Sequence, residues 1–318
     1  MSGTVRSLLT VAGVLFSVLS LAGLLIWVER RLLALWQDRL GPNRLGFLGL
    51  GQVVADTIKI LAKEDWVPPF ADKPLFVLAP AVIMSTTLLS FAVVAFTPSI
   101  AVVHLDTGLL FFLGMSSLGV YSVVIAGWSS NSKYPLLGSM RAAAQMFGYE
   151  VFMGLSLMGV VMQARSFDLR TIVLAQHALW NCIPQFIGFS VFLIAGFAEA
   201  RRLPFDLPEA ENELVAGYHT EYSGMKFGMF FVGEYVGILL ISSFITMLFF
   251  GGWQGPLLPP PLWFALKTFL FVAVFILGRA ALSRPRYDEL IAFGWKLLLP
   301  LSILNLLITG AVLLLLDR

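Results

Sequence analysis

Long apolar runs alternate along this chain with shorter segments that hold most of its charged residues. About 20 apolar residues cross a bilayer as a helix, and the ten-residue alternating segments of a transmembrane barrel do not recur here. The pattern predicts an all-α membrane protein, a polytopic bundle of about eight transmembrane helices forming one integral-membrane domain over residues 1–318. The expected spans are 7–28, 75–97, 107–128, 143–163, 184–200, 228–250, 262–281 and 297–315.

The segment that follows the first span has a different period. Between residues 52 and 65, Val54, Ile58 and Leu61 recur at helical spacing, while charged residues occupy another face. This arrangement is typical of an amphipathic helix at a membrane surface. Two roles are open for it: an anchor that only orients the neighbouring spans, or the floor of an entrance for a lipid-like ligand.

The basic residues are distributed unevenly between the connections. Most of the 21 lysines and arginines fall in or next to segments 29–74, 129–142, 201–227 and 282–296. By the positive-inside rule, these four connections face the cytoplasm or its equivalent, and both termini face the other side.

Several carboxylates lie inside the apolar runs or at their ends. Glu150 and Glu234 fall within the fourth and sixth spans, while Glu29 and Glu199 lie at the ends of the first and fifth. An acidic side chain at the centre of a span costs about 2.5–3.5 kcal/mol on insertion scales. One explanation is a set of structural ion pairs or hydrogen bonds. The other is a proton path, because burial and neighbouring carboxylates raise a carboxyl pKa toward neutrality.

Connection 201–227 concentrates charge between the fifth and sixth spans. Glu209 and Glu213 are four residues apart and would share a face if this connection were helical. Pro204 and Pro208 disfavour a regular helix through it, so we expect a mobile segment. Mutual repulsion of these two carboxylates would make their protonation sensitive to nearby changes of charge, and arginines in this connection and the last one can supply counter-charge. The connection therefore has the composition of a switch.

The sequence gives little sign of disulfides, metal or haem sites, or nucleotide-binding motifs. The lone Cys182 excludes a disulfide within the chain and a thiolate-held cluster, and three scattered histidines make a haem or metal site improbable. Dinucleotide and phosphate-loop motifs are missing, and a net charge of +2 gives no indication of nucleic acid. Lys267, near the outer end of the seventh span, is expected to snorkel toward the surface.

Specific motifs occupy the basic connections. The first contains Gly41-Pro42-Asn43-Arg44 and Asp56 with Lys59; the third contains Pro204-Phe205-Asp206 and Glu209, Glu211 and Glu213; the fourth contains Arg284-Pro285-Arg286-Tyr287-Asp288. Over essentially its whole length, the chain resembles the quinone-site membrane subunit of respiratory complex I, one of the subunit families of NADH-quinone oxidoreductase.

The resemblance implies a subunit of a proton-pumping NADH:quinone oxidoreductase that is not catalytic alone. It assigns a quinone tunnel or entrance to Arg30, Arg39, Asp56, Lys59, Phe227 and Phe231. It assigns proton coupling to Glu29, Glu150, Glu199, Asp206, Glu209, Glu211, Glu213, Glu221 and Glu234. The expected charge partners are Arg201, Arg202, Arg279, Arg284 and Arg286.

The resemblance also implies the surroundings of the chain. Quinone is the substrate, FMN and the iron–sulfur clusters belong to partner subunits, and this chain alone binds no cofactor. Expected partners are the peripheral-arm quinone-site and iron–sulfur subunits, small membrane-arm subunits and membrane lipid, in a bacterial inner membrane or, alternatively, an organelle's inner membrane. A hydrogenase-type paralogue and an independent transporter remain as alternatives, and the choice between ubiquinone and menaquinone stays open.

Overall fold

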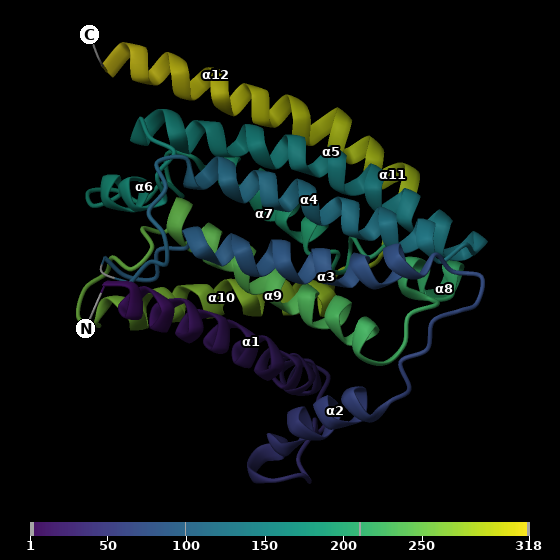
Figure 1. Ribbon diagram of the computed structural model, residues 1–318. Helices are drawn as coiled ribbons and strands as arrows, with labels where there is room; N and C mark the ends of the chain where they lie inside the picture. Colours follow the sequence, from purple (N-terminus) through teal and green to yellow (C-terminus); the bar gives the residue numbers. More distant parts are fainter. Residues whose placement is uncertain (1–2, 99, 210, 317–318) are drawn as a thin grey trace.

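The computed structural model describes residues 3–98, 100–209 and 211–316, and every regular element within these ranges is a helix (Figure 1). The longer helices are α1 (Gly3–Trp36), α2 (Gly51–Ala62), α3 (Lys73–Ser90), α4 (Gly108–Ser129), α5 (Lys133–Ala164), α7 (Phe186–Glu199), α9 (Gly224–Phe249), α10 (Pro260–Ala281) and α12 (Leu299–Leu316). Short helices are α6 (Leu169–Ala175), α8 (Glu211–Leu214) and α11 (Tyr287–Phe293). The predicted all-α fold class is confirmed.

Seven of the helical segments in the described ranges are long and apolar enough to cross a membrane. They overlap seven of the expected spans, and the last runs without a break from α11 through a π-helical turn into α12. The remaining expected span, 184–200, corresponds to α7, which has only 14 residues. At 1.5 Å per residue, α7 is about 21 Å long, which is less than the hydrocarbon thickness of a bilayer.

The irregular chain before α7 is stabilised by side chains inside the bundle. Gln185 Nε2 donates to Thr309 Oγ1 of α12 at 2.7 Å, and Asn305 Nδ2 donates to Gln185 Oε1 at 2.8 Å. Irregular backbone is tolerated at membrane depth where protein surrounds it and supplies hydrogen bonds. Hydropathy alone could not reveal this shortened helix.

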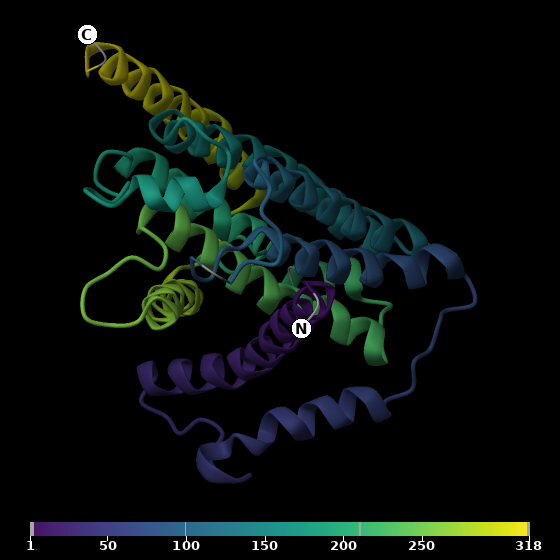
Figure 2. The same ribbon diagram turned by 60° about the vertical axis from the view of Figure 1, so that its left-hand side comes forward.

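The four basic connections meet at one end of the bundle. Figure 1 shows α2, α8 and α11 at this end, which we call the basic end, and shows both ends of the chain with α6 at the opposite end. Helix α9 lies in the middle and is the most buried candidate span, with 83% of its apolar window inside the bundle. It packs against α1, α2, α3 and α10, while α5 and α12 lie farther from α1 (Figure 2).

Helix α2 has two apolar faces with different surroundings. Val53 approaches Gly23 of α1, and Ile60 approaches Gly228 of α9. Val54, Ile58 and Leu61 point away and are 59–63% exposed, and α2 lies beside the basic end of α1 (Figure 2). The structure therefore contains an amphipathic helix in the expected place, with an outward apolar face suited to a membrane surface.

The expectation that Lys267 snorkels is wrong. Its side chain is buried, and its ammonium group donates hydrogen bonds to the carbonyl oxygens of Phe250, Gly252 and Gln254. Snorkelling requires a hydrated head group, whereas this one is enclosed by the turn that follows α9.

Candidate functional site

A buried charge cluster joins three distant parts of the chain at the basic end. Glu29, near the end of α1, is 3% exposed and forms ion pairs with Arg202 and with Arg279 of α10. Tyr235 of α9 bonds to Glu29, and the Arg202 guanidinium lies 4.4 Å from the centre of its ring. Two arginines and a hydroxyl thus compensate one buried carboxylate, as buried charge requires.

Arg202 also connects this cluster to α9. Its Nη2 lies 3.8 Å from Glu234 Oε2, and Glu234 is 6% exposed. Glu234 shares a side-chain hydrogen bond with Glu209, which requires a proton between the two carboxyl groups. Burial and the negative charge of Glu234 raise the pKa of Glu209 well above its usual value. Glu29, Arg202, Glu234 and Glu209 are therefore electrostatically connected.

Arg201 anchors connection 201–227, which we call the acidic connection. Its Nη1 donates to the hydroxyl of Tyr218 at 3.1 Å, and the guanidinium lies 5.5 Å from the centre of that ring. Tyr218 and Gly217 pack against α5 at Gly138, where a Cβ would lie 2.8 Å from Tyr218 N. Gly217 has φ +60°, and a Cβ there would lie 1.8 Å from Pro208 O. Small residues are thus required where the acidic connection contacts the bundle.

Two further carboxylates meet on one side of α4. Ser116 Oγ donates to Glu199 Oε1 at 2.7 Å, and Ser117 Oγ donates to Glu150 Oε2 at 3.2 Å. Adjacent serines therefore connect the end of α7 to the middle of α5. Glu150 Oε1 and Glu199 Oε2 are buried without a hydrogen-bond partner among the described residues. Serines rather than arginines thus contact these carboxylates directly.

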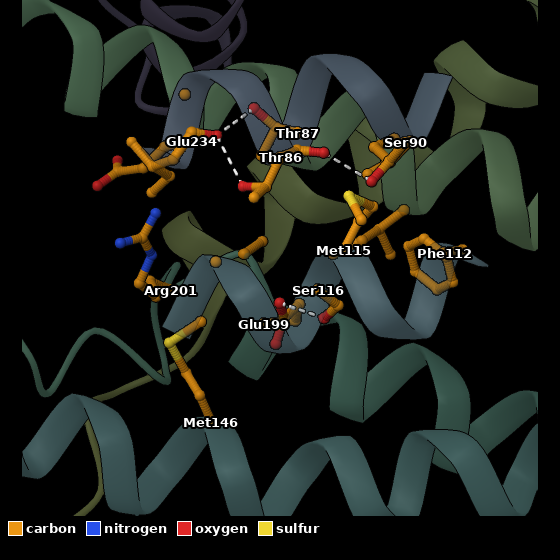
Figure 3. A pocket seen from close by; sticks show the side chains of 17 residues that line it. Thr86, Thr87, Ser90, Phe112, Met115, Ser116, Met146, Glu199, Arg201 and Glu234 are labelled. Atoms are coloured by element: carbon orange, nitrogen blue, oxygen red, sulfur yellow. Dashed lines mark hydrogen bonds between the residues drawn. The ribbon is translucent and has the colours of Figure 1, made fainter. Parts of the chain in front are cut away.

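A cavity of about 50 Å³ connects the two groups of carboxylates. Glu199, Glu234 and Arg201 line it, together with hydroxyl groups of α3 and α4 and apolar groups of α9 (Figure 3). Since one water needs about 10–15 Å³ by this measure, the cavity has room for about three to five water molecules. Figure 3 shows Glu234 and Arg201 at one end and Glu199 with Ser116 farther along. Water here would connect carboxylates that do not touch.

The other predicted acidic residues are distributed differently. Asp206 Oδ2 accepts from Arg284 Nη2 at 2.8 Å, and burial raises the Asp206 pKa even though Arg284 opposes the shift. Glu213 is more than half exposed and pairs with Arg141 Nη1 at 2.7 Å. Glu209 precedes α8 and bonds to a different group from Glu213, so the two carboxylates do not share a helical face. Glu221 is partly buried in the same connection, and the side chain of Glu211 lies outside the described residues.

The predicted charge partners also separate into two kinds. Arg202, Arg279 and Arg284 form ion pairs with the buried acidic groups described above. Arg201 contacts Tyr218 and interacts electrostatically with Glu234, Glu209 and Glu199. Arg286 instead pairs with its neighbour Asp288 at 3.2 Å, and both are largely exposed. The structure thus brings four of the five predicted arginines into the network and leaves Arg286 at the surface.

The predicted quinone-side residues surround the junction of α1, α2 and α9. Arg30 Nη1 donates to Asp56 Oδ2 at 2.8 Å, which connects α1 to α2, and Lys59 is exposed on α2. Arg39 lies in the turn after α1 and donates from Nε to Gln37. Phe227 and Phe231 are stacked at 6.1 Å on α9, and Phe231 contacts Tyr235 at 5.2 Å. This aromatic row leads directly to the cluster around Glu29.

Sequence reasoning missed several members of this site. Ser116 and Ser117 stand in an apolar run with no local feature to distinguish them. Tyr235 follows Glu234 directly in the sequence, yet its hydroxyl contacts Glu29 and Arg202. His219 is one of three histidines that are scattered in the sequence, but in the fold it interacts electrostatically with Glu234. Among the described residues, no group of three or more histidine, cysteine or acidic side chains is arranged to hold a metal ion.

The fold and the site define a multi-pass helical membrane protein with a buried acid–base network at one end. Comparison with known proteins gives the family. The sequence profile of the NADH dehydrogenase family matches residues 9–310. The chain is 63% identical to the H subunit of NADH-quinone oxidoreductase from Methylococcus capsulatus over 310 residues, covering 97% of this chain and 98% of that protein.

This chain therefore belongs to the NADH dehydrogenase family, the family of the H subunits of NADH-quinone oxidoreductase, or complex I. The resemblance inferred from the motifs of the basic connections is confirmed.

Proposed function

We propose that this chain forms much of the quinone tunnel of complex I and the acidic path that couples quinone reduction to proton translocation. It acts with peripheral-arm quinone-site and iron–sulfur subunits and small membrane-arm subunits. Those partners supply FMN and the iron–sulfur clusters, and this chain itself contributes no cofactor. The basic end faces the cytoplasm of a bacterial cell and both termini face the periplasm, as the bias of basic residues supports.

The continuity from an aromatic row to buried carboxylates is the observation that carries this proposal. Phe227, Phe231 and Tyr235 are spaced four residues apart along α9, and the row ends at the pairs formed by Arg202 with Glu29 and Glu234. An isoprenoid quinone needs an apolar, flat-sided passage for its tail and ring. A charge cluster at the end of that passage would respond to the ring's change of charge.

Quinone reduction consumes electrons and protons, so the reduced ring is a transient sink for protons. Loss of a proton from the Glu209–Glu234 pair would leave two negative charges in contact, stabilised by Arg201 and Arg202. The cavity beside Glu234 then offers a route to Glu199, and Ser116 and Ser117 lead on to Glu150. Each step moves a proton between groups that are in contact or are separated by a few water molecules.

A purely structural role explains only part of the network. Arginines compensate Glu29 and Glu234, as a stabilising ion-pair cluster would require. Glu150 and Glu199 receive serine hydroxyl groups, although a buried carboxylate without a cation is costly. Replacing both by glutamine would remove that cost, so their acidic character points to proton transfer. The 63% identity to an H subunit of NADH-quinone oxidoreductase also favours this function over a hydrogenase paralogue or a separate transporter.

The test compares Glu234→Gln with Glu213→Gln in assembled complex reconstituted into liposomes. Glu234→Gln should abolish most proton pumping, because the amide cannot exchange protons with Glu209. Glu213→Gln should assemble normally, because an exposed ion pair contributes at most about 1 kcal/mol, and any loss of pumping would then place Glu213 in the path. Undiminished quinone turnover and proton pumping in assembled Glu234→Gln complex would refute the acidic path.

A further inference from the structure

The cavity that holds Glu199 and Glu234 ends at a pair of phenylalanines. Phe112 of α4 lines the cavity and stacks on Phe244 of α9, with ring centres 3.8 Å apart. Both rings are at most 1% exposed. In Figure 3, Phe112 lies at the end of the cavity away from Glu234 and Arg201. The stacked rings therefore lie between the cavity and the half of the bundle nearer the chain termini.

Beyond this ring pair, a second layer closes the bundle where α9 ends. Lys267 of α10 donates to the carbonyl oxygens of Phe250, Gly252 and Gln254 at 2.6, 3.1 and 2.7 Å. An ammonium group has three donors, so all of its hydrogen-bonding capacity is used. Trp180 and Trp263 enclose it, with ring centres 4.3 and 5.5 Å from Nζ.

Side chains from the irregular segment around α6 complete this layer. Gln176 Nε2 donates to Met247 O at 2.7 Å, and Asn181 Nδ2 donates to Leu248 O at 2.9 Å. The last carbonyl groups of a helix have no partner within the helix, and here buried side chains bind them instead of water. The result is a polar layer in which buried side chains bind these carbonyl groups around one positive charge.

We propose that the Phe112–Phe244 stack and the turn held by Lys267 form a two-layer seal that closes the carboxylate cavity toward the end of the bundle that carries the chain termini. The inference rests on the proposed function only in treating the cavity as part of a proton path. Apolar constrictions exclude water chains, and a fixed positive charge in a narrow passage repels protons and cations. The two layers thus use different physical barriers in series.

The seal would prevent protons from flowing back through the cavity. A water-filled cavity that opened to both sides would let protons return down the gradient that the complex creates. A path that enters from the basic end and is closed at the other end can pass protons only sideways between helices. The glycine- and proline-rich turn after α9 carries no recognisable chemical motif, and the seal explains why that turn encloses a buried lysine.

The experiment measures passive proton uptake by liposomes that contain the assembled complex, with no NADH and no quinone added. Phe244→Ala opens the aromatic layer, and Lys267→Met removes the charge at similar length. Phe275→Ala is the matched control, because Phe275 is buried like Phe244, but its ring packs against Phe197, which does not line the cavity, whereas Phe244 stacks on the cavity residue Phe112. The double variant Phe244→Ala/Lys267→Met should leak several-fold faster than wild type, while Phe275→Ala and Lys267→Arg should not.

Turnover of the same variants with NADH and quinone in detergent should stay close to wild type, since neither residue belongs to the proposed quinone or acidic site. Wild-type leak rates in the assembled double variant would overturn the seal. If Phe244→Ala prevents assembly, Phe244→Leu combined with Lys267→Met provides the same comparison with a smaller change of volume.

A triple variant separates failure of the seal from failure of the proposed function. Adding Glu234→Gln to the leaking double variant should reduce the leak if Glu234 carries protons through the cavity. An unchanged leak would retain the seal and remove Glu234 from the path.

Discussion

Arg284 donates from Nη2 to Asp206 Oδ2 at 2.8 Å, and this ion pair joins the third basic connection to the fourth. Both side chains are mostly buried, and Asp206 also shares a side-chain hydrogen bond with Glu209, while Arg284 Nε has no hydrogen-bond partner among the described residues. The pair fixes the acidic connection against the start of α11, next to the charge cluster of α9.

Removing one member of this pair should destabilise the assembled complex. Arg284→Met leaves a buried carboxylate without its cation, at a cost of up to about 3 kcal/mol. Asp206→Asn should cost less, because the amide oxygen still accepts from Arg284. Thermal unfolding of purified complex measures the difference, and the double variant Arg284→Met/Asp206→Leu should recover part of the loss. Equal midpoints for Arg284→Met and wild type would show that the pair is not stabilising.

The Glu209 carboxyl should make stability depend on pH. Its pKa in the folded protein is raised well above the usual value of 4.5, by burial and by the charge of Glu234. A group whose acid form is favoured by folding stabilises the protein below its unfolded pKa, and that contribution is lost as pH rises through its folded pKa. Wild-type complex should therefore lose stability as pH increases above 4.5, and Glu209→Gln should reduce this slope. Parallel pH profiles of the unfolding midpoint would contradict the shared proton.

Gly217 should not tolerate a side chain. Its φ of +60° disfavours other residues, and a Cβ would lie 1.8 Å from Pro208 O. Gly217→Ala should displace the acidic connection, with a clear loss of assembled complex or of pumping at normal expression. Gly154→Ala is the control, since a Cβ on Gly154 would meet no atom within 4 Å. Immunoblots of native gels measure assembly, and equal behaviour of the two variants would be inconsistent with this packing.

Asp56 and Lys59 should affect quinone binding more than stability. The Arg30–Asp56 pair is partly exposed, so Asp56→Asn should cost at most about 1 kcal/mol of stability. If α2 borders the quinone entrance, Asp56→Asn and Lys59→Met should raise the KM for quinone with kcat little changed. Lys133→Gln, an exposed basic residue on α5, serves as the control. Unaltered quinone affinity and inhibitor sensitivity in both variants would remove α2 from the entrance.

The sequence by itself determined the features that depend on local composition. Hydropathy located seven long spans and the amphipathic α2, because the free energy of burying a helix in lipid is summed over its own residues. The cost of an ionised group in an apolar run also singled out Glu29, Glu150, Glu199 and Glu234 before any contact was known. The motifs of the basic connections were specific enough to give the family.

Only the tertiary structure decided which groups are partners. Glu29 and Arg279 are 250 residues apart and meet because α1 and α10 both pack beside α9. Ser116 and Ser117 bind carboxylates, Glu213 is exposed, and Lys267 lies inside the protein. These outcomes depend on the rotation and depth of each helix against its neighbours. Side-chain packing between helices sets both, and the local sequence does not encode them.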